Sequence, residues 1–246
     1  MKILILSTQT KHHTYFINKI AELHDICGII YERKVLKKDY PTGPFYDHLA
    51  DKFEDKFFED DENTTEDTYQ ISEDLQKKVV EVHSVNNKHL QKYIKSMSPD
   101  LIITFGTGIV KPYIFNTAKW GTINIHRGQI DKYRGLDSDL WAIKNEDFDN
   151  IGVAIHYVDE DLDTGDVLSK GKVLLSNVEE IYHLRYHTTI LATNMMLDVL
   201  ERFQYENGKI EGEKQTEFGE YYTAMSLEEK HLTEDIFNDY KLYDNE

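Results

Sequence analysis

The first 32 residues, MKILILSTQTKHHTYFINKIAELHDICGIIYE (1–32), decide the fold of this chain. They begin with a short apolar run at residues 2–7, which is typical of a buried strand. Residues 12–24 then repeat apolar side chains at helical spacing, and a second apolar run follows at residues 26–31. A strand, a helix and a strand in this order predict two parallel strands joined by a right-handed crossover.

The alternation of strands and helices returns after residue 76 and continues to residue 204. Such alternation favours a parallel, doubly wound α/β sheet with helices packed against it. We predict further strands at 78–84, 100–106, 120–126, 150–158 and 166–175, and further helices at 86–98, 111–118, 138–146 and 178–204.

We therefore expect one large domain, residues 1–204, followed by a polar C-terminal extension, residues 205–246. The extension is expected to pack on this domain or on a partner subunit. Residues 32–76 break the rhythm of the domain because they are dense in acidic side chains, and we interpret them as an insertion. A solvated or mobile surface segment is the plain interpretation, and a lid or a partner contact is the alternative.

The composition excludes several classes of protein. The chain has 246 residues and a net charge of −17, so most of its surface would repel the phosphates of nucleic acids. Its single cysteine, Cys27, allows no internal disulfide and fits a reducing compartment. The first apolar run is too short for a signal peptide core or a membrane span. We expect a soluble, cytoplasmic protein that binds neither nucleic acid nor membrane.

Three predicted strand ends carry glycines or polar side chains, at 105–109, 124–137 and 156–165. Ligands of doubly wound sheets bind at the carboxyl ends of strands. Asn124 and His126 are two residues apart, so in a strand their side chains face the same way. An Asn amide can stabilise a developing oxyanion, and a His can accept a proton near neutral pH. The pair suits attack on a carbonyl, and a purely structural role fits the same spacing.

An acidic turn, HYVDEDLDTGDVL (156–168), follows the next predicted strand. Within it, Asp163 precedes a Thr-Gly pair, where a tight turn can project its side chain inward. A carboxylate near His126 would orient the imidazole and stabilise its protonated form. The alternatives are an acidic surface turn and a calcium loop. Because the spacing does not match the twelve-residue calcium loop, we expect no metal.

Three linked motifs, PDLIITFGTGIV, INIHRG…YRGLDSDLWAI and GVAIHYVDEDLDTGDVL, resemble the formyltransferases that use 10-formyltetrahydrofolate. The chain looks most like the members that act on nucleotide-linked amino sugars. The resemblance covers residues 78–175 and, more loosely, the first strand and helix. It implies a Rossmann-like, mostly parallel sheet with helices on both faces, plus a small C-terminal extension.

The resemblance carries the catalytic Asn, His and Asp of the family onto Asn124, His126 and Asp163. It implies that His126 is the general base, that Asn124 stabilises the formyl oxygen, and that Asp163 orients and charges His126. The formyl donor would be 10-formyltetrahydrofolate, without a metal. For some of the folate contacts a plain core or turn role fits equally well. The expected folate contacts are Phe105, Gly106, Thr107, Gly108, Ile109, His156, Val158, Asp159 and Asp161.

The acceptor implied by the resemblance is the primary amine of a nucleoside-diphosphate-linked amino deoxysugar, used for surface polysaccharide. Enzymes with this acceptor are often homodimers. The alternatives are another small amine, methionyl-tRNA, and hydrolysis of formyltetrahydrofolate. Arg134 could contact a phosphate or instead form an ion pair with Asp137 or Asp139. The expected acceptor contacts are Lys11, His12, His13, Arg127, Gly128, Gln129, Tyr133 and Arg134.

Overall fold

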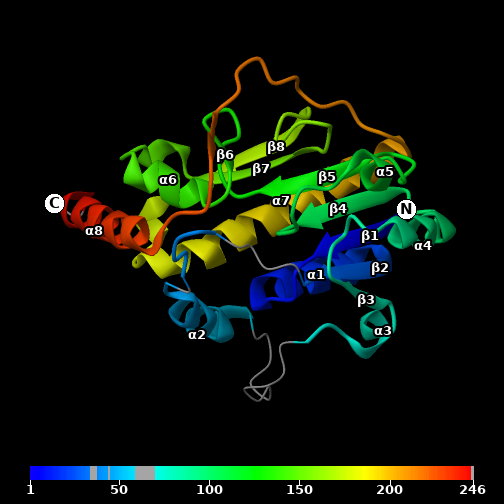
Figure 1. Cartoon of the computed structure of the whole chain (residues 1–246), viewed down its shortest axis with the longest axis horizontal. Coiled ribbons are helices and arrows are strands. Elements are labelled where there is room, and N and C mark those ends of the chain that lie inside the picture. Colours follow the sequence, from blue (N-terminus) through cyan, green and yellow to red (C-terminus); the bar gives the residue numbers. More distant parts are fainter. Residues whose placement is uncertain (34–37, 44, 59–69, 245–246) are drawn as a thin grey trace.

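The structure, a computed structural model, describes residues 1–33, 38–43, 45–58 and 70–244. Within these residues a seven-stranded sheet forms the centre of the molecule, in the strand order β3-β2-β1-β4-β5-β7-β8 (Figure 1). Neighbouring strands from β3 to β5 are parallel, whereas β7 and β8 run antiparallel to their neighbours. The predicted mostly parallel α/β sheet is confirmed. The strands are β1 (Lys2–Ser7), β2 (Asp25–Glu32), β3 (Val79–Val82), β4 (Leu101–Phe105), β5 (Thr122–His126), β7 (Gly152–Tyr157) and β8 (Val167–Lys172).

Helices cover both faces of the sheet, as the alternating side chains of its strands require. Ile3 and Ile5 of β1 belong to one apolar cluster with α1 (Lys11–Leu23) and α7 (Leu184–Glu206). Leu4 and Leu6 belong to a second cluster with α4 (Lys88–Met97) and α5 (Pro112–Phe115). Both faces of β1 are therefore buried, which explains its unbroken apolar run. The remaining helices are α2 (Asp47–Phe58), α3 (Glu73–Gln76), α6 (Ser138–Lys144) and α8 (Leu227–Asp244), with short 3-10 turns at Phe148–Asn150, Leu175–Asn177 and Ile181–His183.

Because β7 is antiparallel to β5, the three predicted strand ends do not all lie at the same edge of the sheet. The segments after β4 and β5 leave the sheet at one edge, but β7 ends at the opposite edge because Ile123 at the start of β5 pairs with Tyr157 at the end of β7. Ile123 and Ile125 pack in the cluster that contains α7. Asn124 and His126 therefore face away from α7, on the other side of the sheet.

The predicted insertion, 32–76, contains α2 and α3, while its residues 34–37, 44 and 59–69 lie outside the described part of the chain. Helix α2 packs beside the start of α7, where Phe53 stacks on His183 with 3.5 Å between ring centroids. Its attachment rests on aromatic and ionic contacts with residues far along the chain.

Helix α7 continues to Glu206, two residues beyond the predicted end of that helix. The chain then passes over β6–β8 and ends in α8, which packs against α6 (Figure 1). Met225 and Phe237 of the extension are fully buried in an apolar cluster with Leu140 and Ile143 of α6. A separate small sheet pairs β9 (Glu220–Tyr222) in parallel with β6 (Tyr133–Gly135).

Candidate active site

Four polar side chains gather on the face of β5 and β7 that lies away from α7. Asn124 and His126 come from alternate positions of β5, and His156 of β7 pairs with Asn124 in the antiparallel register. The turn after β7 folds back over this face and places Asp163 between the two histidines. Its carboxylate oxygens lie 3.6 Å from His126 Nδ1 and 3.5 Å from His156 Nε2. The structure thus brings together the three residues predicted to be catalytic, together with His156.

His126 is held in one tautomer. Its Nε2 lies 2.8 Å from the carbonyl oxygen of Tyr133, and because a carbonyl can only accept, Nε2 carries the hydrogen. Gly128 packs so closely that an added Cβ would lie 3.0 Å from Nε2. Burial lowers the pKa of His126 below 6.5, while the Asp163 carboxylate opposes this change. The neutral ring therefore presents an unprotonated Nδ1 toward Asp163.

Asp163 is a buried carboxylate in an unusual backbone conformation. Its φ is +54°, in the left-handed region that residues with a Cβ rarely adopt. Its Oδ2 accepts a hydrogen bond of 3.0 Å from the Gly135 N–H. Burial raises the pKa of Asp163, but His156, His126 and the Gly135 N–H outweigh it and bring the pKa to about 2. The carboxylate is therefore charged at neutral pH.

Asn124 is oriented by two neighbours. Its Oδ1 accepts a hydrogen bond of 2.7 Å from Thr104 Oγ1, which places Nδ2 on the other side of the amide. Nδ2 lies 3.2 Å from His156 Nε2, and His156 Nδ1 lies 2.9 Å from the carbonyl oxygen of Tyr157. Because a carbonyl can only accept, His156 Nδ1 carries a hydrogen. The second N–H of Asn124 remains to bind an oxygen, so the group combines a base, a charged partner and an amide donor.

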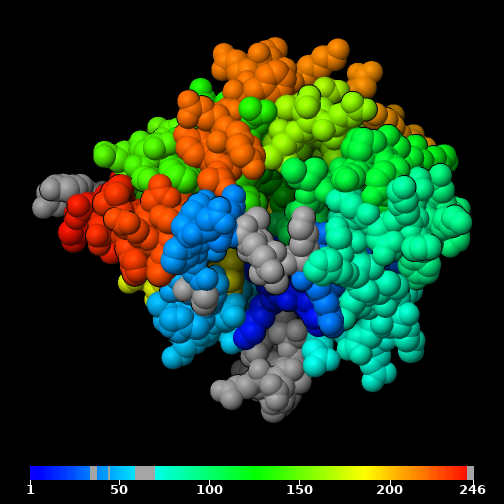
Figure 2. Space-filling view, in the orientation of Figure 1, coloured from blue at the N-terminus to red at the C-terminus, as the bar shows by residue number. Residues whose placement is uncertain are grey.

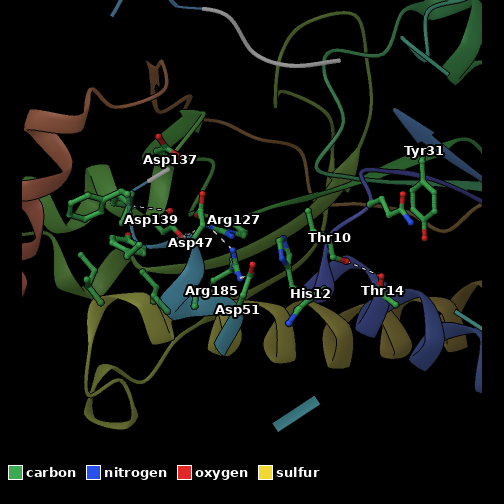
Figure 3. Close-up of a pocket in the computed structure, with 18 of the residues that line it drawn as sticks. Thr10, His12, Thr14, Tyr31, Asp47, Asp51, Arg127, Asp137, Asp139 and Arg185 are labelled. Atoms are coloured by element: carbon green, nitrogen blue, oxygen red, sulfur yellow. Dashed lines mark hydrogen bonds and ion pairs between the residues drawn. The ribbon is translucent and has the colours of Figure 1, made fainter. Parts of the chain in front are cut away.

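A cavity of about 1060 Å³ lies at the carboxyl ends of β1 and β2. Lys11, His12 and Arg127 line it, so three of the predicted acceptor contacts meet there. Figure 3 shows Arg127 and Arg185 grouped with acidic side chains, and His12 beside Thr10 at the start of α1. Arg127, which directly follows His126 in the sequence, lines the cavity, whereas Asn124, His126, His156 and Asp163 do not.

Cations and carboxylates are paired in this cavity. Arg127 donates to Asp139 at 2.9 Å, and Lys230 lies 3.7 Å from Asp137. Arg185 bonds to Glu54 of α2 at 2.7 Å and also to Asp51. A ligand with both positive and negative groups would therefore meet partners of both signs.

Two buried histidines open α1 beside the cavity. His13 is predicted as an acceptor contact, but its Nδ1 bonds to Thr8 and its ring packs 4.4 Å from that of Phe105. Burial lowers its pKa to about 3. Burial and then the neighbouring His13 also lower the pKa of His12, whose Nδ1 has no hydrogen-bond partner among the described residues. Of the two, only His12 lines the cavity.

Two other predicted acceptor contacts serve the scaffold. The buried Gln129 donates to the Gly171 carbonyl at 2.8 Å. The Tyr133 hydroxyl donates to Asp147 at 3.0 Å. Gly128 lies against His126, as described above. In this part of the loop, the backbone carbonyl of Tyr133 is the group that contacts His126.

Arg134 also points away from the cavity. Its Nε donates to the Gly219 carbonyl at 2.6 Å, and its Nη1 lies 3.5 Å from the Leu162 carbonyl. The considered ion pairs with Asp137 and Asp139 do not form, because Asp139 bonds Arg127 and Asp137 accepts from the backbone of the extension.

The predicted folate contacts after β4 form a turn held by a buried carboxylate. Phe105 is 2% exposed and packs in the core, whereas Ile109 is 66% exposed. The Gly108 N–H donates to Glu32 Oε2 at 2.8 Å, and Glu32 Oε1 accepts from the Val85 N–H at 3.0 Å. The buried Glu32 therefore fixes the turn and leaves Ile109 facing outward.

The other predicted folate contacts lie around this turn or beyond β7. Gly106 is exposed and Thr107 half-buried. Val158 is half-buried and packs on the cluster that contains α4 and α5, whereas Asp159 and Asp161 are exposed. His156 lies apart from them, in the polar group described above. No cluster of His, Cys, Asp or Glu suited to a metal ion occurs among the described residues. In the same part of the chain, no helix has the length and apolarity to span a membrane.

Sequence reasoning missed Glu32, Arg185 and Gln215. Glu32 ends an apolar strand and Arg185 lies near the start of a long helix, so neither shows a local sign of its role. Gln215, in the extension, donates to the carbonyls of Asp163 and Gly165. Only the tertiary structure reveals these contacts.

Comparison with known proteins gives a consistent result. A family model described as formyl transferase matches residues 57–200. Methionyl-tRNA formyltransferase of Alkaliphilus metalliredigens is 35% identical over 133 residues, which are 54% of this chain and 41% of that protein. The chain thus spans less than half the length of this relative.

Two solved structures share the fold. A sugar N-formyltransferase from a Shewanella species aligns with a TM-score of 0.62 at 15% identity, covering 96% of this chain and 87% of that one. HypX from Aquifex aeolicus, solved in complex with tetrahydrofolic acid, aligns with a TM-score of 0.55 at 17% identity, covering 97% of this chain and 34% of that one.

Proposed function

The chain belongs to the formyl transferase family, whose model matches more than half of it, and we propose that it formylates an amine. The donor is 10-formyltetrahydrofolate, and the acceptor is the primary amine of a nucleoside-diphosphate-linked amino deoxysugar. The observation that carries this proposal is the group of Asn124, His126 and Asp163, in which the Asp163 carboxylate faces the His126 imidazole.

In the proposed reaction the amine nitrogen attacks the formyl carbon, and His126 Nδ1 takes a proton from the amine. Asp163, 3.6 Å away, stabilises the imidazolium that forms. The free N–H of Asn124 binds the formyl oxygen as negative charge develops on it. His126 then returns the proton to the folate nitrogen as its bond to the formyl carbon breaks. Holding the two reactants together can lower the barrier by about 7–11 kcal/mol.

The donor is proposed to bind between the turn after β4 and the segment after β7. The turn is fixed by Glu32 and exposes Ile109, which offers an apolar surface for a flat ring. The segment after β7 folds back and brings Asp163 beside His126 at the end of β5, the strand that pairs with β4. The folate complex of the Aquifex aeolicus protein, which shares this fold, also supports a folate donor.

The acceptor is proposed to occupy the cavity lined by Lys11, His12 and Arg127. Arg127 and Lys11 would bind phosphate, and the carboxylates nearby would bind hydroxyl groups or the ammonium form of the amine. The net charge of −17 favours a small acceptor over RNA. The similarity of the whole fold to a sugar N-formyltransferase adds support. A cytoplasmic location, pairing of two copies and a role in making polysaccharide belong to the same proposal.

Methionyl-tRNA is the second candidate acceptor, because the curated relative with 35% identity is named for it. A coupled assay separates the candidates. The protein is supplied with 10-formyltetrahydrofolate and either nucleotide-linked amino sugars or methionyl-tRNA, while tetrahydrofolate and the formylated product are measured. A formylated sugar nucleotide would support the proposal, and formylated methionyl-tRNA would replace its acceptor. Folate turnover without any amine would indicate a hydrolase.

A further inference from the structure

The C-terminal extension lies across the turn that carries Asp163. Figure 1 shows this segment (orange) passing over β6–β8, and Figure 2 shows it against the green and yellow-green surface of the same region. Gln215 Nε2 donates to the carbonyl of Asp163 at 3.1 Å and to that of Gly165 at 2.8 Å. Beside it, the backbones of Glu213 and Val167 exchange two hydrogen bonds of 2.7 and 2.8 Å. The extension thus holds the turn from both sides of Thr164.

Arg134 makes a second tie between the extension and the same turn. Its guanidinium joins the Gly219 carbonyl, at 2.6 Å, to the Leu162 carbonyl, at 3.5 Å, just before Asp163. Arg134 lies in β6, whose partner strand β9 belongs to the extension. An added Cβ on Gly135 would lie 2.1 Å from the Tyr222 carbonyl, so the two strands are in close contact.

Strand β6 in turn supplies the backbone groups that fix the proposed base and its partner. The Tyr133 carbonyl accepts from His126, and the Gly135 N–H donates to Asp163. Asp163 also needs support of its own, because its left-handed φ of +54° is disfavoured for a residue with a Cβ. The bonds from Gln215 oppose relaxation of this turn.

We propose that Gln215 and Arg134 are positioning residues for catalysis, which act through Asp163 and His126. The inference rests on the proposed function. We call residues 213–222 of the C-terminal extension the brace. The brace holds the Asp163 carboxylate against the His126 imidazole. Neither residue touches the reacting atoms.

The test replaces Gln215 by Met, which keeps its length but removes both donors. The control is Gln204→Met, the same chemical change at an exposed position of α7. We expect Gln215→Met to lower kcat by up to about 100-fold, the effect that a small misplacement of a catalytic group can have. The KM values for both substrates should change little. The acid limb of the pH profile should move to lower pH, because a displaced Asp163 no longer raises the pKa of His126.

If Gln215→Met has the same kcat and pH profile as Gln204→Met, the proposed role of the brace is wrong. It is also wrong if kcat falls only in proportion to the fraction of unfolded protein. If Gln215→Met does not fold, Gln215→Glu serves instead. Its ionised carboxylate cannot donate to either carbonyl, so it should give the same defect. If the unaltered protein shows no formyl transfer, the proposed function fails. An NMR titration of His126 in the unaltered and Gln215→Met proteins then still tests the brace, and equal titration curves would reject it.

Discussion

Nδ1 of His126 lies 3.6 Å from Oδ2 of Asp163, while Nε2 of the same ring is bonded to the Tyr133 carbonyl. Both side chains are buried, and the carboxylate is charged at neutral pH because the pKa of Asp163 is about 2. Only Nδ1 can therefore accept a proton, and it does so beside a negative charge. This arrangement leaves the proposed base one atom that can take a proton, and the following predictions rest on it.

Replacing His126 by Ala should abolish most of the transfer while leaving the fold intact. Loss of a positioned general base typically costs about 10²- to 10⁴-fold in rate. Steady-state kinetics with saturating donor and acceptor measure the effect, and circular dichroism checks the fold. His89→Ala, at an exposed position of α4, is the matched control. Near-normal turnover of the His126 variant would refute its role as a base.

Replacing Asp163 by Asn should lower kcat and shift the acid limb of the pH profile. Asn tolerates the left-handed backbone but carries no charge, so the pKa of His126 should fall further below 6.5. The base would then stay unprotonated to a lower pH, but its imidazolium would be less stable during transfer. The measurement is kcat/KM from about pH 5 to pH 9. If the acid limb lies at the same pH in both proteins, Asp163 does not raise the pKa of His126.

The protein should lose stability in mild acid because of its buried histidines. The pKa of His13 is lowered by burial from 6.5 to about 3, so the unfolded chain binds a proton below pH 6.5 that the folded protein does not. The free energy of unfolding is therefore unaffected above pH 6.5 and decreases as the pH falls toward 3. This residue alone should cost about 2 kcal/mol at about pH 5. His12 and His126, whose pKa values are also lowered, act in the same direction.

Urea unfolding at about pH 7.5 and about pH 5 measures this loss. In His13→Asn the difference between the two conditions should shrink, because Asn does not titrate. His89→Asn should keep the full difference, since His89 is exposed. An unchanged difference in His13→Asn would contradict the assignment.

Replacing Arg185 by Met should strongly destabilise the protein. Arg185 bonds to Glu54, whose side chain is fully buried, and also to Asp51. Its removal leaves a carboxylate buried without its partner, which costs about 3–5 kcal/mol. Arg33→Met is the control, because Arg33 pairs with Glu81 at an exposed position where such a pair contributes about 1 kcal/mol or less. Equal urea midpoints for the two variants would show that the bonds of Arg185 to Glu54 and Asp51 do not hold α2 in place.

The sequence alone determined the order of the strands and helices of the main sheet and much of the candidate site. The apolar run of β1 reflects burial on both faces, and Asn124 and His126 share a face because strand side chains alternate. These properties are local, so periodicity and spacing reveal them. The family motifs added Asp163, which the structure brings beside His126.

Only the tertiary structure decided which distant groups meet. The antiparallel direction of β7 sends the following turn back over the sheet and adds His156 to the polar group. Arg134 bonds to the extension rather than facing the cavity, and Gln215 reaches the Asp163 turn from the far end of the chain. Such contacts depend on strand direction and on how the extension packs, and neither leaves a periodic mark in the sequence.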